Sequence, residues 1–313
     1  MVPSVPSMSG YKLLTHETAD GPRAAVVIGD RVFDAAALAN RADYATALGV
    51  LNDWAAADAM FASFAAKGGA EKGGVPLSSA RLLAPILYPG QIFGAGANYE
   101  DHIAEMSKSE FKAQNARKAG GRPWHFGKSS RSAVIGHGSV RPLPPYSSKV
   151  DWEIELAVVI GRTATRIAAE HALDHVAGYT IANDLSARDF VVRDGIEANS
   201  PFRFDWIAHK GFDGACPLGP WIVPARDIPD PQRLGLKLWV DDEEMQNSNT
   251  RHMIFSVAEQ IEELSARVTL HPGDLILSGT PSGVGMGRNV FLKSGQRLRL
   301  WIENIGELHH GFS

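Results

Sequence analysis

The chain has 313 residues, of which 44% are hydrophobic and 21% charged, and its formal net charge at neutral pH is -4. This composition is typical of a globular protein, and the mild acidity argues against a nucleic-acid partner or binding to an anionic membrane surface. A single cysteine, Cys216, excludes an intrachain disulfide and a cysteine-rich zinc site.

The first elements along the chain predict a small α/β domain that covers residues 1–80. The N-terminal ten residues lack the basic start and apolar core of a secretory signal, and no later run reaches the roughly 18 apolar residues of a membrane-spanning helix, so we expect a cytoplasmic protein. Residues 24–28 are apolar and precede Gly29 and Asp30, a pattern typical of a β-hairpin. Residues 34–40 and 44–67 have helical spacing, and the second segment predicts one helix closed by Gly68 and Gly69.

Residues 81–313 predict a second, larger domain that is mostly β. Short apolar runs bounded by glycine and proline predict strands at 91–94, 153–161, 177–182, 220–223, 234–240, 274–278 and 297–302, and residues 257–264 have a helical period. Strands do not alternate regularly with helices, which argues against a doubly wound parallel sheet. We therefore expect an α+β protein with a mixed or antiparallel β-sandwich or roll.

Alternating acidic residues mark the start of one predicted strand. Asp151, Glu153 and Glu155 share a face if this segment is extended, because side chains alternate along a strand. Like charges on one face repel, and their burial is costly unless a cation lies among them. The first interpretation of the pattern is therefore a site for one hard, oxygen-binding ion such as Mg2+, Mn2+ or Ca2+, and the alternative is a solvated acidic strand.

Motifs between residues 85 and 305 resemble those of the fumarylacetoacetate hydrolase superfamily. In chain order they are Asn98-Tyr99-Glu100-Asp101-His102-Ile103-Ala104-Glu105, Phe126-Gly127-Lys128, Asp151-Trp152-Glu153-Ile154-Glu155, Ala182-Asn183-Asp184, Ala187-Arg188-Asp189, Lys210-Gly211-Phe212-Asp213 and Gly279-Thr280-Pro281-Ser282-Gly283. One such motif is weak, but all of them occur in the family's order. The resemblance implies that Glu153, Glu155 and Asp184 bind one divalent ion per active site.

The resemblance also implies a catalytic role for three residues outside the acidic strand. His102 and Glu105 are three residues apart, which places them on one face of a helix, and the family uses such a dyad to activate water. Lys210 matches a lysine that steadies negative charge on the substrate. Arg188 serves either a substrate carboxylate or a structural ion pair, and the resemblance implies substrate contacts for Thr280 and Tyr99.

The family's reactions leave the activity open. The first hypothesis is a metal-dependent hydrolase that cleaves a carbon–carbon bond of an acylpyruvate or β-diketo acid through a metal-stabilised enolate. The alternative is an isomerase or decarboxylase of 2-hydroxy-diene-dioates or oxaloacetate-type 2-oxo acids in aromatic catabolism. Val191 favours this alternative, because hydrolases of the family commonly carry at that position a glutamine that stabilises an oxyanion. A non-catalytic metal- or ligand-binding protein is the hypothesis from another class.

Three further features are open from sequence alone. Residues 107–123 are polar and basic, and they form either a lid over the substrate or a plain solvated helix. Residues 191–209 are longer than the equivalent segment in many family members. The resemblance implies a homodimer.

Overall fold

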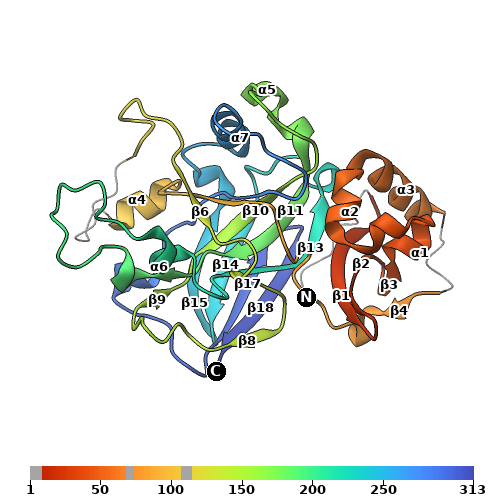
Figure 1. Ribbon diagram of the computed structural model, residues 1–313, viewed down its shortest axis with the longest axis horizontal. Coiled ribbons are helices and arrows are strands. Elements are labelled where there is room, and N and C mark those ends of the chain that lie inside the picture. The colour runs from red at the N-terminus through yellow and green to blue at the C-terminus, as the bar shows by residue number, and fades with distance from the viewer. Residues whose placement is uncertain (1–8, 68–72, 107–114) are drawn as a thin grey trace.

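The computed structural model describes residues 9–67, 73–106 and 115–313 and is built on one large mixed sheet (Figure 1). Within these residues 11 strands form the sheet, and β7 (Val134–Ile135) pairs beside β13 off the main path. The path is β4 (Val75–Pro76), β3 (Arg31–Asp34), β2 (Gly21–Ile28), β1 (Lys12–Thr18), β13 (Cys216–Pro224), β11 (Val176–Asn183), β10 (Ile154–Ile160), β16 (Leu275–Leu277), β5 (Ile92–Ala95) and β6 (His125–Lys128).

A second sheet of five strands packs on the first. Its order is β15 (Glu243–Asn249), β14 (Gly235–Val240), β17 (Arg297–Ile302), β18 (Gly306–Phe312) and β8 (Ser139–Arg141). Strands β14, β17 and β18 contact β10, β11 and β13 of the large sheet. Every residue of β10 and β11 is buried, which explains why β10 is a continuous apolar run after its first two residues. The predicted mostly β, mixed-sheet α+β fold is confirmed.

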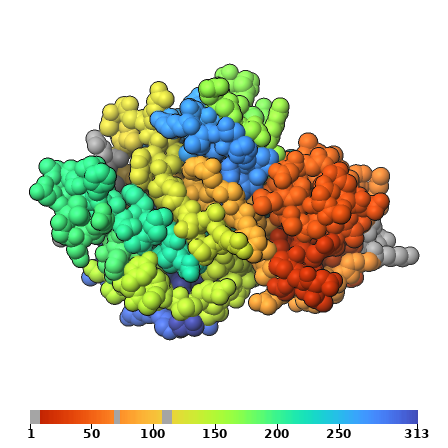
Figure 2. Space-filling view, in the orientation of Figure 1, coloured from red at the N-terminus to blue at the C-terminus, as the bar shows by residue number. Residues whose placement is uncertain are grey.

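The N-terminal residues form a lobe at one end of the molecule (Figure 2). The predicted hairpin is confirmed, since β2 and β3 pair antiparallel across Gly29 and Asp30. β1 also pairs with β13, with Leu13 opposite Ile222, so this lobe extends the large sheet. The division at residue 80 stays a prediction.

The predicted single helix over residues 44–67 is wrong. The segment contains a 3-10 turn (Ala42–Ala45), α2 (Ala47–Asn52) and α3 (Trp54–Ala66), after α1 (Ala35–Ala39). Thr46 is extended and its side chain accepts from the Gly49 N–H, which starts α2 as a new helix. Asp53 then leaves helical geometry between α2 and α3. Gly68 and Gly69 lie outside the described residues.

Short elements at one end of β10 hold most of the residues that the sequence predicts for the active site. They are α4 (Glu100–Met106), α6 (Trp206–Lys210), α8 (Gly285–Arg288) and the two-stranded pair β9 (Val150–Asp151) and β12 (Ser186–Ala187). Helices α5 (Ala169–Ala172) and α7 (Val257–Ser265) contact each other and lie above β10 and β11 in the view of Figure 1. A capping box formed by Ser256 and Glu259 fixes the start of α7. Among the described residues, no helix has the length and apolar character needed to cross a membrane.

Candidate active site

Three buried carboxylates meet at the point where β10 begins and β11 ends. Glu153 precedes β10, Glu155 is the second residue of β10, and Asp184 follows β11. One oxygen from each lies within 4.8 Å of the others. The strand was predicted to start at Glu153, but Trp152 and Glu153 instead link β9 to β10, with the Asn183 side chain accepting from the Glu153 N–H. This link still directs Glu153 and Glu155 to the same place.

Two buried lysines pair with these carboxylates. Lys210 Nζ lies 2.8 Å from Glu153 Oε2 and 2.6 Å from Asp184 Oδ2. Lys128 Nζ lies 2.5 Å from Asp184 Oδ1, and its side chain has no exposed surface. Burial alone would lower the pKa of Lys210, but Asp184 and Glu153 raise it above its ordinary value, so the ammonium group keeps its charge.

Arg188 forms structural ion pairs with the same cluster. Its Nε donates to Asp151 Oδ2 at 2.9 Å, and its terminal amine donates to Glu153. Asp151 also accepts from the N–H groups of Gly285 and Met286, so it anchors the start of α8. Of the two roles predicted for Arg188, the structure shows the ion pair.

Glu155 is the carboxylate that lacks a cationic partner among the described residues. The hydrogen bond to its side chain comes from the Gly279 N–H, at 2.6 Å. Gly279 has a φ of 99°, and a Cβ there would lie 2.8 Å from Asn98 Cβ, so the loop needs glycine at this point. Burial, together with the neighbouring Asp184 and Glu153, raises the pKa of Glu155 well above its ordinary value.

The cluster fits a divalent cation. Four carboxylates (Asp151, Glu153, Glu155 and Asp184) face three cationic side chains, which leaves one formal negative charge unbalanced in a buried site. All the donors are carboxylate oxygens, which hard ions such as Mg2+, Mn2+ and Ca2+ prefer. The residues present therefore suit such an ion, and Glu155 is the one whose charge it would balance.

His102 and Glu105 lie together on α4, as their spacing predicts. His102 Nδ1 is 3.7 Å from Glu105 Oε2, an ion-pair distance that is longer than a hydrogen bond. The Gly283 N–H donates to both oxygens of Glu105, at 3.1 and 3.0 Å. Burial opposes the charge on Glu105, but the His102 ring and the Gly283 N–H lower its pKa below the ordinary value. Glu105 is therefore a fixed carboxylate behind His102.

A cavity of about 430 Å³ brings most of the predicted residues together. Its lining includes His102, Glu153, Glu155, Arg188 and Lys210, and also Thr280. The Thr280 hydroxyl donates to the Ile154 carbonyl and accepts from Gln246, so its hydrogen bonds are already made within the fold.

Tyr99 does not reach the cavity wall in this structure. Its side chain has no exposed surface and belongs to the apolar core. Tyr99 directly precedes α4 and is buried, and the substrate contact predicted for it stays a prediction.

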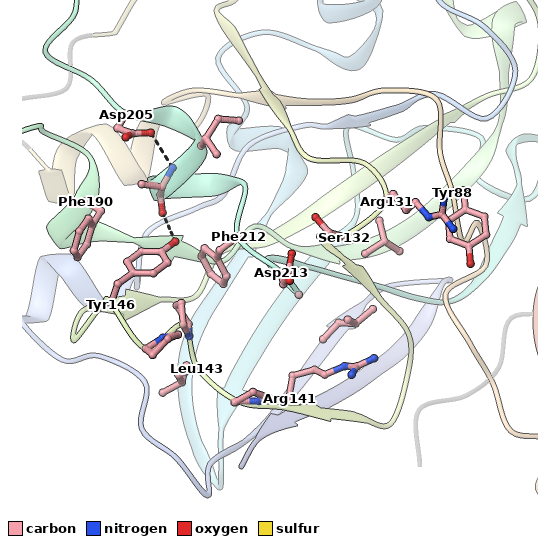
Figure 3. A pocket seen from close by; sticks show the side chains of 18 of the residues that line it. Tyr88, Arg131, Ser132, Arg141, Leu143, Tyr146, Phe190, Asp205, Phe212 and Asp213 are labelled. Carbon is pink, nitrogen blue, oxygen red and sulfur yellow. Dashed lines mark hydrogen bonds between the residues drawn. The ribbon is translucent and has the colours of Figure 1, made fainter.

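A larger cavity, of about 1240 Å³, is lined in part by Ile207 and Ala208 of α6. Figure 3 shows this cavity from close by. Its lining combines Tyr88, Arg131, Arg141 and Tyr146 with several prolines, and the Tyr146 hydroxyl donates to the Ala208 carbonyl. None of the clustered carboxylates lines it. Size alone therefore does not locate the chemistry, and we assign the reaction to the smaller cavity.

Lys128 is the residue of the cluster to which sequence analysis gave no role. It belongs to one of the motifs that carry the resemblance, but nothing local indicates that it points inward. Its partner Asp184 is 56 residues away along the chain. The aromatic side chains of the cavity, Trp124, Phe126 and Trp206, were likewise given no role, since isolated aromatic residues are usual in any core.

The segment over residues 107–123 is described only from residue 115. There Arg117 donates to Glu259 Oε1 at 2.6 Å and to the Ile254 carbonyl, which ties this part to α7. The remainder of the predicted lid, with Lys108 and Lys112, lies outside the described residues.

Comparisons with known proteins agree on one family. Residues 91–313 match the model of the C-terminal domain of fumarylacetoacetate hydrolase. Proteins from Burkholderia lata and Burkholderia ambifaria that are named as hydrolases are 43% and 44% identical over 230 and 221 residues, which is 72% and 70% of this chain and 75% and 72% of theirs.

Solved structures extend the likeness to nearly the whole chain. A Mycobacterium smegmatis protein described as HpcE has 34% identity and a TM-score of 0.77, covering 96% of this chain and 98% of its own. At the same coverage, maleylpyruvate hydrolase from a Sphingobium species, with manganese and pyruvate bound, has 30% identity and a TM-score of 0.73. A 2-hydroxyhepta-2,4-diene-1,7-dioate isomerase from Mycobacterium marinum has 30% identity and a TM-score of 0.68, also covering 96% of this chain and 98% of its own. The chain belongs to the fumarylacetoacetate hydrolase family.

Proposed function

We propose that this protein is a divalent-metal-dependent hydrolase that cleaves a carbon–carbon bond of an acylpyruvate or a related β-diketo acid. The observation that carries the proposal is one cavity that is lined by Glu153 and Glu155 of the carboxylate cluster, by Lys210 and by His102. Glu105 lies behind His102. A base and an acidic cluster facing one small cavity suit water attack on an oxo acid.

His102 is the base in this proposal. Glu105 lies behind Nδ1, which leaves Nε2 as the nitrogen that takes a proton from water. The water oxygen bonds to the distal carbonyl carbon of the substrate, and the bond from that carbon to the methylene carbon breaks. The electron pair passes to the methylene carbon, which takes up the proton that His102 removed from water, so the products are a carboxylic acid and pyruvate. Lys210 keeps its positive charge and opposes the negative charge that develops on the substrate.

Glu153, Glu155 and Asp184 are the residues that would hold the ion. When bound, Mg2+ or Mn2+ supplies Lewis-acid polarisation of the substrate's oxygen atoms. Support for a divalent ion comes from the unbalanced charge at Glu155 and from the manganese bound to the Sphingobium relative.

A second candidate keeps the same residues but omits the attack of water. It is an isomerase or decarboxylase of 2-hydroxy-diene-dioates or oxaloacetate-type 2-oxo acids. The observation in its favour is Val191, which lines the cavity and offers only an apolar side chain there. A polar donor at an oxyanion contributes about 3 kcal/mol to lowering a barrier, so its loss weighs against hydrolysis.

The test is proton NMR in heavy water of the metal-loaded enzyme with acylpyruvates, oxaloacetate and 2-hydroxy-diene-dioates. Two acid fragments from an acylpyruvate support the hydrolase. Deuterium exchange, double-bond migration or loss of carbon dioxide without fragments assigns the second candidate. His102→Asn should lower turnover by roughly 100-fold or more, since general-base catalysis contributes at least that much.

A surface histidine supplies the matched control for this variant. His171 is 68% exposed at the end of α5, so His171→Asn should leave turnover unchanged. If His102→Asn matched the control in turnover of every substrate, the dyad would have no role. If the unaltered protein turned over none of the substrates, a non-catalytic ligand-binding protein would become the better interpretation. A homodimer and a cytoplasmic location stay predictions, and sedimentation velocity measures the first.

A further inference from the structure

Three aromatic side chains form one wall of the reaction cavity. This aromatic wall consists of Trp124, Phe126 and Trp206. The ring centroids of Phe126 and Trp206 are 5.3 Å apart with an interplanar angle of 17°, and those of Trp124 and Trp206 are 5.0 Å apart. Phe126 and Trp206 are stacked and Trp124 is tilted against both, and together the three rings give a broad apolar face. The proposed reaction assigns no role to this face.

One glycine in β5 and one just after it make room for the wall. A Cβ at Gly94 would lie 2.4 Å from the Phe126 ring, and a Cβ at Gly96 would lie 2.1 Å from the Trp124 ring. Both glycines face β6, where Gly94 pairs with Phe126 and the Gly96 N–H donates to the Trp124 carbonyl. The rings therefore rest directly on bare backbone, and their position depends on these two glycines.

The wall begins where the charged cluster ends. Lys210 Nζ lies 5.1 Å from the Phe126 ring centroid while it also bonds Glu153 and Asp184. A substrate whose oxo-acid end lies at Lys210 thus has Phe126 beside it, with Trp206 and Trp124 further along. Apolar side chains complete the lining, among them Met106, Val191, Phe255 and Met286.

The described part of the lining offers no cation for a second carboxylate. Arg188 is bound to Asp151 and Glu153, and Lys210 is bound to Glu153 and Asp184. Burial and the nearby Lys210 lower the pKa of His209, which is therefore neutral. Arg117 lies 4.6 Å from the Phe255 ring centroid, but it is paired with Glu259. Among the described residues, a charged tail would lose its hydration here without gaining a cationic partner.

We propose that the distal group of the substrate is uncharged and apolar, an alkyl or aryl chain, and that it binds against Trp124, Phe126 and Trp206. This inference rests on the proposed function for its oxo-acid end. It sets the chain apart from the Mycobacterium marinum relative named for a dioate, whose substrate carries a carboxylate at each end.

The first test is calorimetric binding of two 2-oxo acids of matched length to the metal-loaded enzyme. One ends in a phenyl group and the other in a carboxylate. We expect the phenyl compound to bind roughly tenfold more tightly or better, because the wall buries its ring and the carboxylate finds no partner. Equal affinity, or tighter binding of the compound with two carboxylates, would overturn the inference.

The second test displaces the wall without touching the cluster. Gly96→Ala forces the Trp124 ring away, whereas Gly127→Ala on β6 meets no atom within 4 Å and is the matched control. We expect Gly96→Ala and Trp206→Ala each to weaken phenyl binding by roughly fivefold, with pyruvate binding unchanged, since an aromatic contact contributes about 1 kcal/mol. If Gly96→Ala behaves like Gly127→Ala and Trp206→Ala also binds normally, the wall does not bind the tail.

The two proposals fail in different ways. Preferential binding of the phenyl compound without any hydrolysis of acylpyruvates would refute the proposed function and leave the tail site standing. Hydrolysis of acylpyruvates at the same kcat/KM with charged and apolar tails would support the proposed function and refute the tail site.

Discussion

Replacing Lys128 by methionine tests whether the acidic cluster depends on its buried cations. The side chain has no exposed surface, and its ammonium group lies 2.5 Å from Asp184 Oδ1. Methionine fills similar space but leaves four carboxylates facing two cationic groups. Removing one partner of a buried ion pair costs about 3–5 kcal/mol. Because Lys210 also contacts Asp184, we expect the lower end, about 3 kcal/mol, which is a large part of the 5–15 kcal/mol typical of a protein.

The assay is urea unfolding near neutral pH with a chelator present, so that no metal compensates for the lost charge. Lys237→Met is the matched control, since Lys237 pairs with Glu244 at the surface, where such a pair contributes less than about 1 kcal/mol. If the two variants differed in unfolding free energy by less than about 1 kcal/mol, the cluster would not need Lys128 as a counter-charge. Turnover is not the readout, because Lys128 is not among the residues that line the reaction cavity.

Three further outcomes follow from the same structure. Glu155→Gln should be at least as stable as the wild type when a chelator is present, because burial, Asp184 and Glu153 already disfavour the charge on Glu155. With metal at about 100 times its Kd, the free energy of unfolding measured in urea should rise by about 2.7 kcal/mol for the wild type and by much less for the variant. Burial lowers the pKa of His310 to about 3, so the folded protein favours the neutral ring, and this contribution to stability is complete above pH 6.5 and is lost as the pH falls from 6.5 towards 3. By about pH 5 the free energy of unfolding should have fallen by about 2 kcal/mol. His310→Gln should flatten that part of a plot of urea midpoint against pH. Cys216 is fully buried, and burial raises the pKa of its thiol to about 12. A thiol reagent should therefore label one group per chain in urea and none in the native protein, and fast labelling of the native protein would contradict this.

Local patterns predicted those parts of the fold in which neighbouring residues decide the structure. The hairpin around Gly29 and Asp30 and the buried strand β10 are confirmed, because turn chemistry and a continuous apolar run are local signals. The helix over residues 44–67 was predicted too long, since Thr46 and Asp53 interrupt it through backbone conformations that an alanine-rich composition does not reveal.

The acidic cluster was predicted from spacing and family resemblance, but its balance of charge was not. Alternation along the strand indicated that Glu153 and Glu155 lie together, and it favoured a metal as the compensating charge. The structure adds Lys128, Arg188 and Lys210 as internal counter-charges. Their approach depends on how distant strands and α6 pack, and a sequence pattern does not report which long side chains turn inward.

Helix α6 contributes residues to the walls of both cavities and so lies between them. Trp206, His209 and Lys210 line the reaction cavity, whereas Ile207 and Ala208 line the larger one. The Tyr146 hydroxyl on the wall of the larger cavity donates to the Ala208 carbonyl, so removing that hydroxyl takes a hydrogen bond away from the same five-residue helix that positions Lys210. For protein engineering, this makes the wall of the larger cavity a place to adjust turnover while every group that touches the substrate keeps its identity.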